Sequence, residues 1–508
     1  MNSTKKINMS LNRSTALIPI LVLLFTACSW QRHEPLAGAG DSNASRAVIR
    51  VAVTSQGYAF HRPWQQRQPT RQNGIGVIVS EGRVLVTAML VANHRYIELE
   101  AADTQRKGRA EVEVVDYEAN LALIKPVDED FLAGRQPLQL CNPMVSGQSL
   151  YIWQVKPDGD VVPSEARITS IELSPYSQDN YFLTYRLNGS LQYGFSNITL
   201  PAIRDNRLAG LVLRYNAGGQ TIDVIPPSVI RHFLADAADG RYLGFPRAGF
   251  HYGPTMDPQL RRYIGLEEGQ SGIYVQKVIK GGPADRAGLQ AGDVIARVGD
   301  FPISNTGQYE HPLYGKTSLI HLIRTTYYVG NSIPVQVYRK GRTLDLSITA
   351  DHRRPDQYLI PPYVLDKPPE YLIVGGLVFQ ELSVSYLLEY GKDWASHAPI
   401  NLVYYQQNQE YLNGDQRDRR EKIVIISNVI PTPFSIGYED LNDLVVTRVN
   451  GRLIGKLSDV REALNKPVEG FHKIEVEQDP GLLFLDPKQI DTIHRIIRER
   501  YRIPIPPL

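Results

Sequence analysis

Serine, histidine and aspartate side chains can together cleave an amide bond, and the first half of this chain offers a set of them: His94, Asp116 and Ser196. A serine hydroxyl is a poor nucleophile until an imidazole accepts its proton, and a carboxylate must orient that imidazole. The base must also lie within hydrogen-bond reach of the hydroxyl, about 3 Å. Whether these residues do chemistry therefore depends on the elements that position them.

The segment 74–125 would carry the first two of these residues. It begins G-I-G-V-I-V, continues V-L-V-T-A-M-L-V-A, and ends in V-V-D-Y-E-A-N-L-A-L-I-K. This pattern resembles the first barrel of the trypsin-like proteases of the HtrA/Deg family, in which T-x-x-H-V supplies the base and D-x-x-x-D-L-A-L-L-K supplies the orienting carboxylate. At those two positions this chain has Leu90 and Asn120. The resemblance thus implies the frame of a protease without its base.

The stretch Tyr193–Ala202 corresponds to the nucleophile motif of that family, G-N-S-G-G-P-L. An alignment on Gly194 puts Ser196 at the nucleophile. An alignment on Pro201 puts Ile198 there and matches two neighbours as well, so we prefer it. In both alignments the two glycines after the serine are missing, and glycine is what lets the backbone aim its amides at an oxyanion without a Cβ clash.

The set His94, Asp116 and Ser196 is therefore the alternative of a displaced triad. His94 lies about one helical turn beyond Leu90, which moves the imidazole several ångströms from the expected position. The simpler interpretation makes His94 a loop histidine, Asp116 a turn residue and Ser196 a surface hydroxyl. We favour it, because loss of the serine or the histidine alone costs such a unit several orders of magnitude in rate. The degenerate positions are then Leu90, Asn120 and Ile198, with no catalytic residue expected.

Short runs rich in Val, Ile, Leu and Tyr, separated by Gly, Asn and Asp, predict many short strands and an all-β arrangement. With the family resemblance, the predicted fold is mainly β: a trypsin-like double β-barrel followed by two PDZ domains of the α+β class. The segment Gln56–Gln72, rich in Gln, Arg and aromatic residues, has two interpretations. It resembles the loop that HtrA proteins use in oligomer and lid contacts, or it is a solvated hairpin.

The first PDZ-like region has a specific pattern. Its string A-G-L-Q-A-G-D-V-I-A-R-V-G, from Ala287 to Gly299, is similar to PDZ signatures. Backbone amides of the preceding loop would cradle a peptide carboxylate, and the ligand would add as a strand. A helix near Lys316–Thr326 would supply the side-chain pocket, although its apolar residues could instead only pack the core. The expected peptide-binding residues are Arg247, Ala248, Gly249, Phe250, Leu319, Leu322 and Ile323.

An internal repeat predicts a second, divergent PDZ-like domain. The run that follows Asp293 (V-I-A-R-V) recurs after Asp443 (L-V-V-T-R-V), whereas P-A-x-x-A-G-L is not repeated. The entry segment 368–379 and the turn at Gly437 resemble the C-terminal PDZ domain of plant-type organellar Deg proteases. That resemblance implies a docking element that holds an oligomer together rather than a peptide receptor.

The N-terminus has the layout of a secretion signal. Lys5, Lys6 and Arg13 precede the short apolar run Ala16–Phe25, which ends at Thr26-Ala27-Cys28. Small residues before Cys28 resemble a bacterial lipobox, which implies lipidation of that cysteine. Ser29 in place of aspartate implies an anchor in the outer membrane that faces the periplasm.

Length and motifs together give the predicted division of the 508 residues. It comprises a lipoprotein-type signal peptide (1–28), a flexible tether (29–45), a degenerate trypsin-like domain (46–236), PDZ domain 1 (246–352), a linker (353–369) and a divergent PDZ domain 2 (370–508). A net charge of +2 gives no argument for nucleic acid. No cluster with metal-ligand spacing occurs in the sequence, so no metal or cofactor is expected.

These patterns predict a non-proteolytic, HtrA/Deg-like protein that binds unfolded or C-terminally exposed polypeptides as a periplasmic chaperone or scaffold. The alternative is an active serine endopeptidase of periplasmic protein quality control with an atypical triad through Ser196. A third interpretation is a regulatory subunit that assembles with an active Deg paralogue. The resemblance also implies a homo-oligomer, trimeric or higher.

Overall fold

The structure is a computed structural model that describes residues 43–80, 82–101, 104–155, 161–177, 180–192, 199–412 and 420–506. Cys28 and the predicted signal peptide lie outside the described residues. So do Ser196 and Ile198, the two candidates for the nucleophile position.

The first half of the trypsin-like region is a closed barrel with strand order β1-β2-β3-β6-β5-β4. β1 alternates buried and partly exposed residues, because one of its faces fills the barrel interior, whereas β3 and β6 have consecutive buried residues. Short helices close its ends. The elements are α1 (Asn43–Ala47), β1 (Val48–Ser55), β2 (Thr70–Ser80), β3 (Arg83–Val86), α2 (Ala88–Val91), β4 (His94–Glu100), β5 (Lys107–Asp116) and β6 (Leu121–Pro126).

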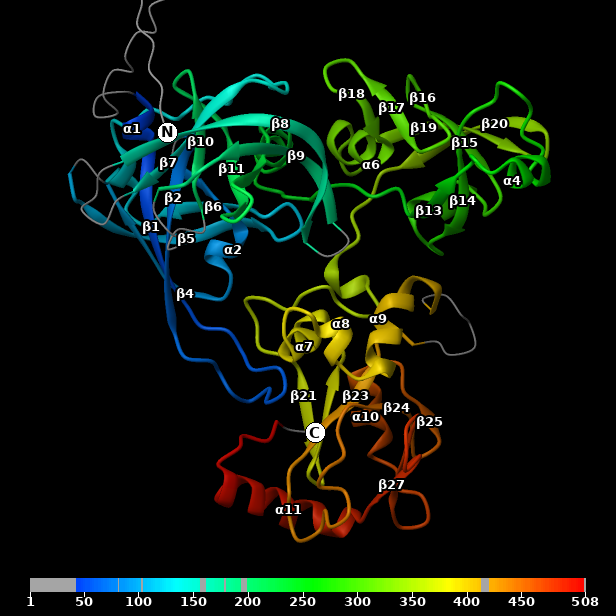
Figure 1. The fold of residues 1–508 in the computed structure, drawn as a ribbon. Helices are drawn as coiled ribbons and strands as arrows, with labels where there is room; N and C mark the ends of the chain where they lie inside the picture. Colours follow the sequence, from blue (N-terminus) through cyan, green and yellow to red (C-terminus); the bar gives the residue numbers. More distant parts are fainter. Residues whose placement is uncertain are drawn as a thin grey trace, which may run out of the picture. The chain divides into compact units, whose positions relative to one another are not determined.

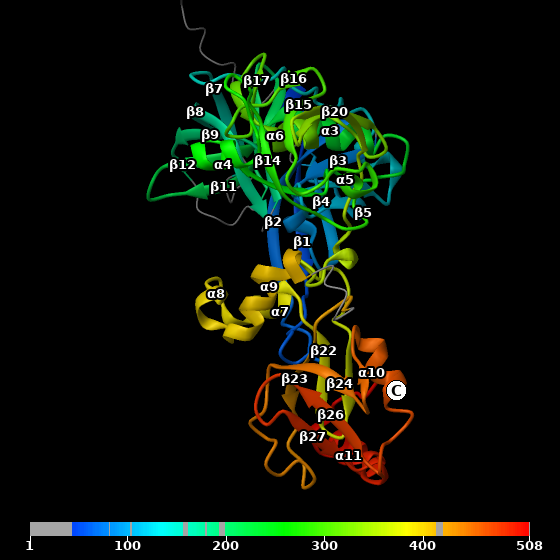
Figure 2. The same ribbon diagram turned by 90° about the vertical axis from the view of Figure 1, so that its right-hand side faces the viewer.

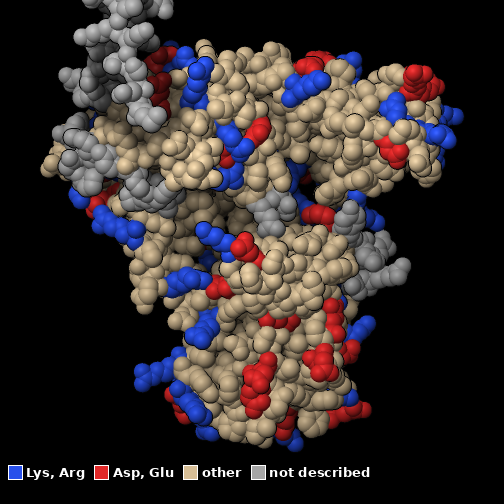
Figure 3. All heavy atoms as spheres, in the orientation of Figure 1, with Lys and Arg blue, Asp and Glu red and all other residues tan. Residues whose placement is uncertain are grey.

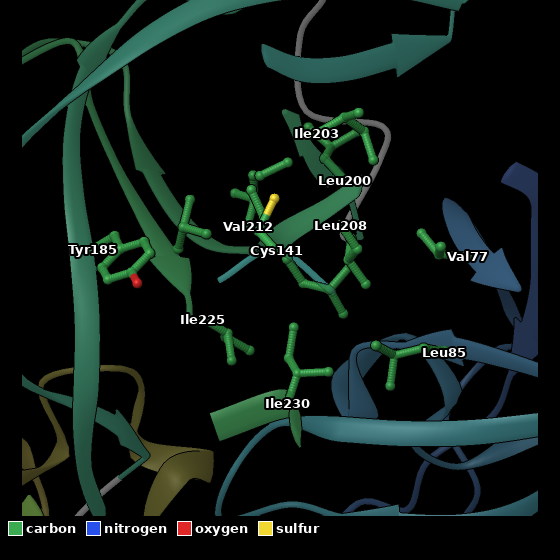
Figure 4. Packing of buried hydrophobic residues seen from close by; sticks show 14 of the residues in the cluster. Val77, Leu85, Cys141, Tyr185, Leu200, Ile203, Leu208, Val212, Ile225 and Ile230 are labelled. Carbon is green, nitrogen blue, oxygen red and sulfur yellow. The ribbon is translucent and has the colours of Figure 1, made fainter. Parts of the chain in front are cut away.

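A second closed barrel follows, with strand order β10-β11-β12-β9-β8-β7. The helix α3 follows its last strand, β12, in the sequence. One buried apolar cluster joins the two barrels: Val77 and Leu85 of the first lie beside Leu200 and Leu208 of the second (Figure 4). The elements are β7 (Ser149–Val155), β8 (Val161–Ser177), β9 (Asn180–Gly189), β10 (Pro201–Arg204), β11 (Arg207–Asn216), β12 (Thr221–Ile225) and α3 (Pro227–Asp236).

The next region contains a sheet of order β13-β14-β15-β19-β20 (Figure 1). β13 stands at one edge of this sheet, with β14 as its only strand partner in the described part of the chain. The elements are β13 (Phe250–Pro254), α4 (Pro258–Tyr263), β14 (Ile273–Val278), α5 (Pro283–Arg286), β15 (Val294–Val298), β16 (Phe301–Pro302), β17 (Gln308–His311), β18 (Gly315–Ser318), α6 (Leu319–His321), β19 (Ser332–Arg339) and β20 (Arg342–Thr349).

The C-terminal region holds a sheet of order β21-β22-β23-β24-β26-β27, with helices packed around it (Figure 2). Its elements are β21 (Tyr371–Val374), β22 (Leu377–Glu381), α7 (Val384–Leu387), α8 (Trp394–His397), α9 (Ile400–Leu412), β23 (Val424–Val429), β24 (Leu444–Val449), β25 (Arg452–Leu453), α10 (Leu457–Ala463), β26 (His472–Val476), β27 (Leu482–Leu485) and α11 (Ile490–Ile496).

The predicted fold class is confirmed: a mainly β chain with trypsin-like barrels and PDZ domains. Over the described residues, no helix is long and apolar enough to cross a membrane. Lys and Arg side chains are interspersed with Asp and Glu on the face shown in Figure 3, in keeping with the small net charge of +2.

Candidate functional site

Leu90 lies on α2, where the family motif has its base, and its side chain is completely buried. It packs so closely that a Cβ added at Gly74 would lie 2.8 Å from its Cδ2 atom. On the same side, the buried hydroxyls of Thr87 and Thr199 bond to each other, and the Thr87 amide donates to Thr199 at 3.2 Å. The place of the proton acceptor is therefore filled by an aliphatic side chain in an apolar core.

Asn120 takes the place of the orienting aspartate, in a left-handed conformation with φ of 54°. Its Oδ1 atom accepts a hydrogen bond from the backbone amide of Met89 at 3.0 Å. The amide side chain thus ties the loop after β5 to α2. It carries no charge with which to stabilise an imidazolium.

His94 and Asp116, from the displaced triad, have other partners. His94 is the first residue of β4, and its Nδ1 atom lies 2.9 Å from the carbonyl oxygen of Val91, the last residue of α2. Asp116 is buried, and it accepts from the amides of Glu118 (2.7 Å) and Ala119 (2.8 Å) and from the hydroxyl of Tyr242. Burial raises the pKa of Asp116 above its usual value. Among the described residues, the structure shows no hydrogen bond between His94 and Asp116, and Ser196 lies outside them.

The loop 116–120 instead holds a buried ionic cluster. The Oε2 atom of Glu118 accepts from Arg324 at 2.9 Å and from Arg247 at 3.4 Å, and Glu118 and Arg324 are only 2% and 5% exposed. The guanidinium of Arg324 also lies over the ring of Phe182, 4.0 Å from its centroid. Both arginines belong to the PDZ region, so this cluster connects the first barrel to PDZ domain 1.

Within this cluster, both Glu118 and Arg324 are ionised at neutral pH. Burial alone would raise the pKa of Glu118, but the charges of Arg247 and Arg324, with the imidazole of His352 3.7 Å away, lower it well below its usual value. Burial lowers the pKa of Arg324 to about 10, which still leaves the guanidinium protonated. The pair is therefore charged and shielded from water.

The predicted carboxylate-binding loop leads into the edge strand β13. Gly249 has φ of 80°, and a Cβ there would lie 2.9 Å from Cδ of Pro283, so the loop needs glycine. The carbonyl of Ala248 accepts from Ala284, and that of Gly249 accepts from Ile279, both at 2.9 Å. These bonds fix the loop against α5 and leave Phe250 half-buried at the start of β13.

The other predicted peptide-binding residues have core or linking roles in this structure. Leu319, Leu322 and Ile323 are 0%, 1% and 7% exposed and belong to the core of PDZ domain 1. The side chain of Arg247 bonds to Glu118 and Asn180, and its backbone amide bonds to Asp351. The loop backbone and the free edge of β13 are what the structure offers to a ligand.

Sequence reasoning missed Glu118, Arg324 and the role of Arg247. The sequence does contain a hint of this cluster: Glu118 is an acidic residue between Asp116 and Asn120, in a motif that otherwise consists of apolar and catalytic positions. It did not identify the partner, since 206 positions separate Glu118 from Arg324 in sequence. Over the described residues, no group of His, Cys, Asp and Glu side chains is arranged to hold a metal ion.

Comparison with known proteins gives matches over both halves of the chain. Residues 263–350 and 360–506 each match a family model described as a PDZ domain. Protease Do-like 2, chloroplastic, from Arabidopsis thaliana is 25% identical over 481 residues, covering 93% of this chain and 76% of that protein. Protease Do-like 4, mitochondrial, from the same plant is 23% identical over 465 residues, covering 91% and 84%. Among solved structures, that of the HtrA-type protease AlgW with decapeptide is 19% identical, with a TM-score of 0.47, and covers 62% of this chain and 97% of that chain.

Two closed barrels followed by two PDZ domains define a trypsin-like, PDZ-containing protein. These two relatives, which match nearly the whole length of this chain, are a chloroplastic and a mitochondrial Do-like protease. In sequence and domain order the chain is similar to the HtrA/Deg family over nearly its whole length.

Proposed function

We propose that this chain is a non-proteolytic, polypeptide-binding member of its family that acts as a periplasmic chaperone or scaffold. The observation that carries the proposal is the fully buried Leu90 side chain, packed against Gly74 at the place of the general base. A hydrocarbon side chain accepts no proton, so a serine at this site would stay a poor nucleophile. Asn120, bonded to Met89, adds no carboxylate to the site.

The binding partner in this proposal is an unfolded or C-terminally exposed polypeptide. PDZ domain 1 supports it with a glycine-containing loop that opens onto the edge strand β13. An extended peptide can pair with such an edge through main-chain hydrogen bonds while the loop amides receive its carboxylate. Because the helix residues Leu319 and Leu322 are buried, side-chain selectivity would be weak and main-chain pairing would dominate.

Hydrolysis of casein by the purified chain and by its Ser196→Ala variant tests the first half of the proposal. We expect no hydrolysis above background from either protein. Hydrolysis by the wild type that the substitution abolishes would overturn the proposal and establish the displaced triad through Ser196.

Fluorescence anisotropy with labelled peptides tests the second half. Peptides with a free C-terminus should bind, and C-terminal amidation should weaken them, because the amide removes the charge that the loop amides receive. Gly249→Ala should abolish binding, since its Cβ would lie 2.9 Å from Pro283. Gly265→Ala is the matched control: it has a similar positive φ (68°), but no atom within 4 Å of the added Cβ. Equal binding by all of these proteins would contradict the assigned site.

The subcellular localisation and the oligomeric state of the chain are parts of the same proposal. Lipidation of Cys28 should place the chain on the periplasmic side of the outer membrane, and Cys28→Ser should release it into the soluble fraction. Light scattering of the released protein should give a trimer or a larger homo-oligomer. Co-purification of an active Deg paralogue would instead favour a regulatory subunit.

A further inference from the structure

The loop Gln56–Pro69, which connects β1 and β2, contacts the C-terminal domain. It folds on itself through a bridge between Tyr58 and Gln66 and a hydrogen bond of 3.0 Å from Ala59 to Gln65. Figure 2 shows it extending from the first barrel toward the elements α7 and β22, and its Phe60 bonds to Gln380 of β22. It is therefore a structured arm with a defined binding surface.

Two aromatic residues anchor the arm. Phe60 packs against the apolar cluster around α7, its amide donates to Glu389 at 3.0 Å, and its carbonyl accepts from Gln380 at 3.1 Å. Trp64 packs against the cluster around α11 and lies edge-on to Tyr371. Arg67 adds an ion pair of 2.7 Å to Glu389.

His61 occupies an aromatic pocket between these anchors. Its ring lies 4.7 Å from the ring of Tyr386 and 4.7 Å from that of Tyr390. Both tyrosine hydroxyls donate to the buried carboxylate of Asp443, at 2.6 Å each, so the tyrosines are fixed by Asp443. The Nε2 atom of His61 is buried and has no hydrogen-bond partner among the described residues.

The pocket therefore fits a neutral imidazole better than a charged one. Burial lowers the pKa of His61 below its usual value of 6.5, and the charge of Arg67 acts in the same direction. The carboxylates of Asp443 and Glu389 oppose this effect but do not outweigh it. An added proton on Nε2 would be a buried donor without an acceptor, which costs free energy.

Asp443 corresponds to Asp293 of PDZ domain 1, and the two aspartates have different partners. Asp293 is 1% exposed and forms an ion pair of 2.6 Å with Arg339. In the repeat, Asp443 bonds to Tyr386 and Tyr390 in place of an arginine. That replacement builds the aromatic walls into which His61 inserts.

We propose that the arm 56–69 is a latch on the C-terminal domain, docked while His61 is neutral and released when His61 is protonated. A cavity of about 220 Å³ lined by Tyr58, Arg67, Leu388 and Glu389 remains beneath the arm, so the contact is not completely packed. Asn93 and Asp366 bond reciprocally, at 2.7 and 2.9 Å, on residues outside the arm. Release of the arm therefore leaves a separate contact between the first barrel and the C-terminal part in place.

The direction of the pH effect follows from linkage. A folded-state pKa below the usual value means that docking is fully stabilised above pH 6.5 and weakens as pH falls through the docked pKa. One proton changes the docking equilibrium by at most about tenfold per pH unit. Between about pH 5 and neutrality the side chains whose ordinary pKa lies in the window are histidines, and the chain has eleven of them, so a variant at His61 is needed to isolate its contribution.

Hydrogen exchange followed by mass spectrometry on the full chain tests the latch, with protection factors for residues 56–69 corrected for intrinsic rates. We expect wild-type protection to fall several-fold, and by no more than about tenfold, between about pH 7.5 and about pH 5.5, because the change is confined to pH values below 6.5. His61→Phe keeps an aromatic ring in the pocket without a titrating group, so its protection should not change with pH. His397→Phe, on the exposed helix α8, is the matched control and should behave like the wild type.

Two outcomes would overturn the latch. One is unchanged protection of the wild-type arm over this range; the other is the same pH dependence in His61→Phe as in the wild type. Should His61→Phe fail to dock, His61→Ala gives a second reading. It should lower the protection of the arm at about pH 7.5 and remove its pH dependence, and the wild-type pH dependence in this variant would equally refute the role of His61.

Discussion

Replacement of Glu118 by glutamine should destabilise the protein more than any surface charge substitution. Glu118 is 2% exposed and is bonded to Arg324, which is 5% exposed and also covers the ring of Phe182. The variant keeps the shape of the side chain but leaves a buried guanidinium without a counter-charge. Removing one partner of a buried ion pair costs about 3–5 kcal/mol.

The lower end of that range is expected here, because the glutamine oxygen still accepts a hydrogen bond. A loss of about 3 kcal/mol lowers the melting temperature of a domain of this size by about 6–12 °C. Differential scanning calorimetry measures this as a downward shift of the transition that contains the barrels. Glu113→Gln is the matched control, because it breaks an ion pair of 2.7 Å with Arg83 at the surface. The side chains of Arg83 and Glu113 are 26% and 30% exposed. A surface pair of this kind contributes about 0–1 kcal/mol.

Two further measurements separate an orphaned charge from a general packing defect. Arg324→Met in the Glu118→Gln background should recover part of the lost stability, because it removes the unpaired guanidinium. The low pKa of Glu118 means that its stabilisation is complete above the usual value of 4.5 and is lost as pH falls further. The difference between wild type and variant should therefore shrink in acid. Equal shifts for Glu118→Gln and Glu113→Gln, or a difference that does not change with pH, would refute the reasoning.

The remaining predictions concern the degenerate site and PDZ domain 1. Leu90→Ala should cost about 2–5 kcal/mol in urea unfolding, because the side chain is fully buried, whereas Met89→Ala, at a side chain 49% exposed, should be nearly neutral. Leu90→His combined with Asn120→Asp should not produce casein hydrolysis, because the glycines that shape an oxyanion hole are missing from the sequence after Ile198; hydrolysis blocked by a serine-directed inhibitor would contradict this. Asp293→Asn should destabilise PDZ domain 1 by about 3 kcal/mol, because it leaves Arg339 without its buried partner; a melting temperature within error of the wild type would count against that role.

Local patterns predicted the fold because they correspond to local physical constraints. In PDZ domain 1, Gly288 and Gly292 have φ of 79° and 97°, so the turn that leads into β15 needs glycine, and the sequence string shows it. The short apolar run Val84–Val86 became the barrel strand β3 and is buried on both faces: Val84 and Val86 belong to one apolar cluster, and Leu85 belongs to the cluster that joins the two barrels.

Contacts between regions far apart in the sequence could not be predicted in the same way. The arm 56–69 had two interpretations, because its own residues do not identify the surface that they contact. His61 and Tyr386 are 325 positions apart by number, and only the folded chain brings their rings together. The peptide pocket expected from Leu319, Leu322 and Ile323 was drawn from a helical pattern that serves equally for a core, and all three side chains are buried.

The loop 116–120 has a structural role that does not depend on catalysis. In an active triad this loop presents a carboxylate to the base, and its geometry must be held firmly. In this chain Asp116 still fixes the turn through two amides, and Asn120 still bonds to the backbone beside Leu90. The carboxylate that remains available, that of Glu118, is directed to the arginines of PDZ domain 1. If the chain is non-proteolytic as proposed, a rigid loop with no base to orient is still suited to hold PDZ domain 1 in place through Glu118 and Arg324, which would explain why the frame persists.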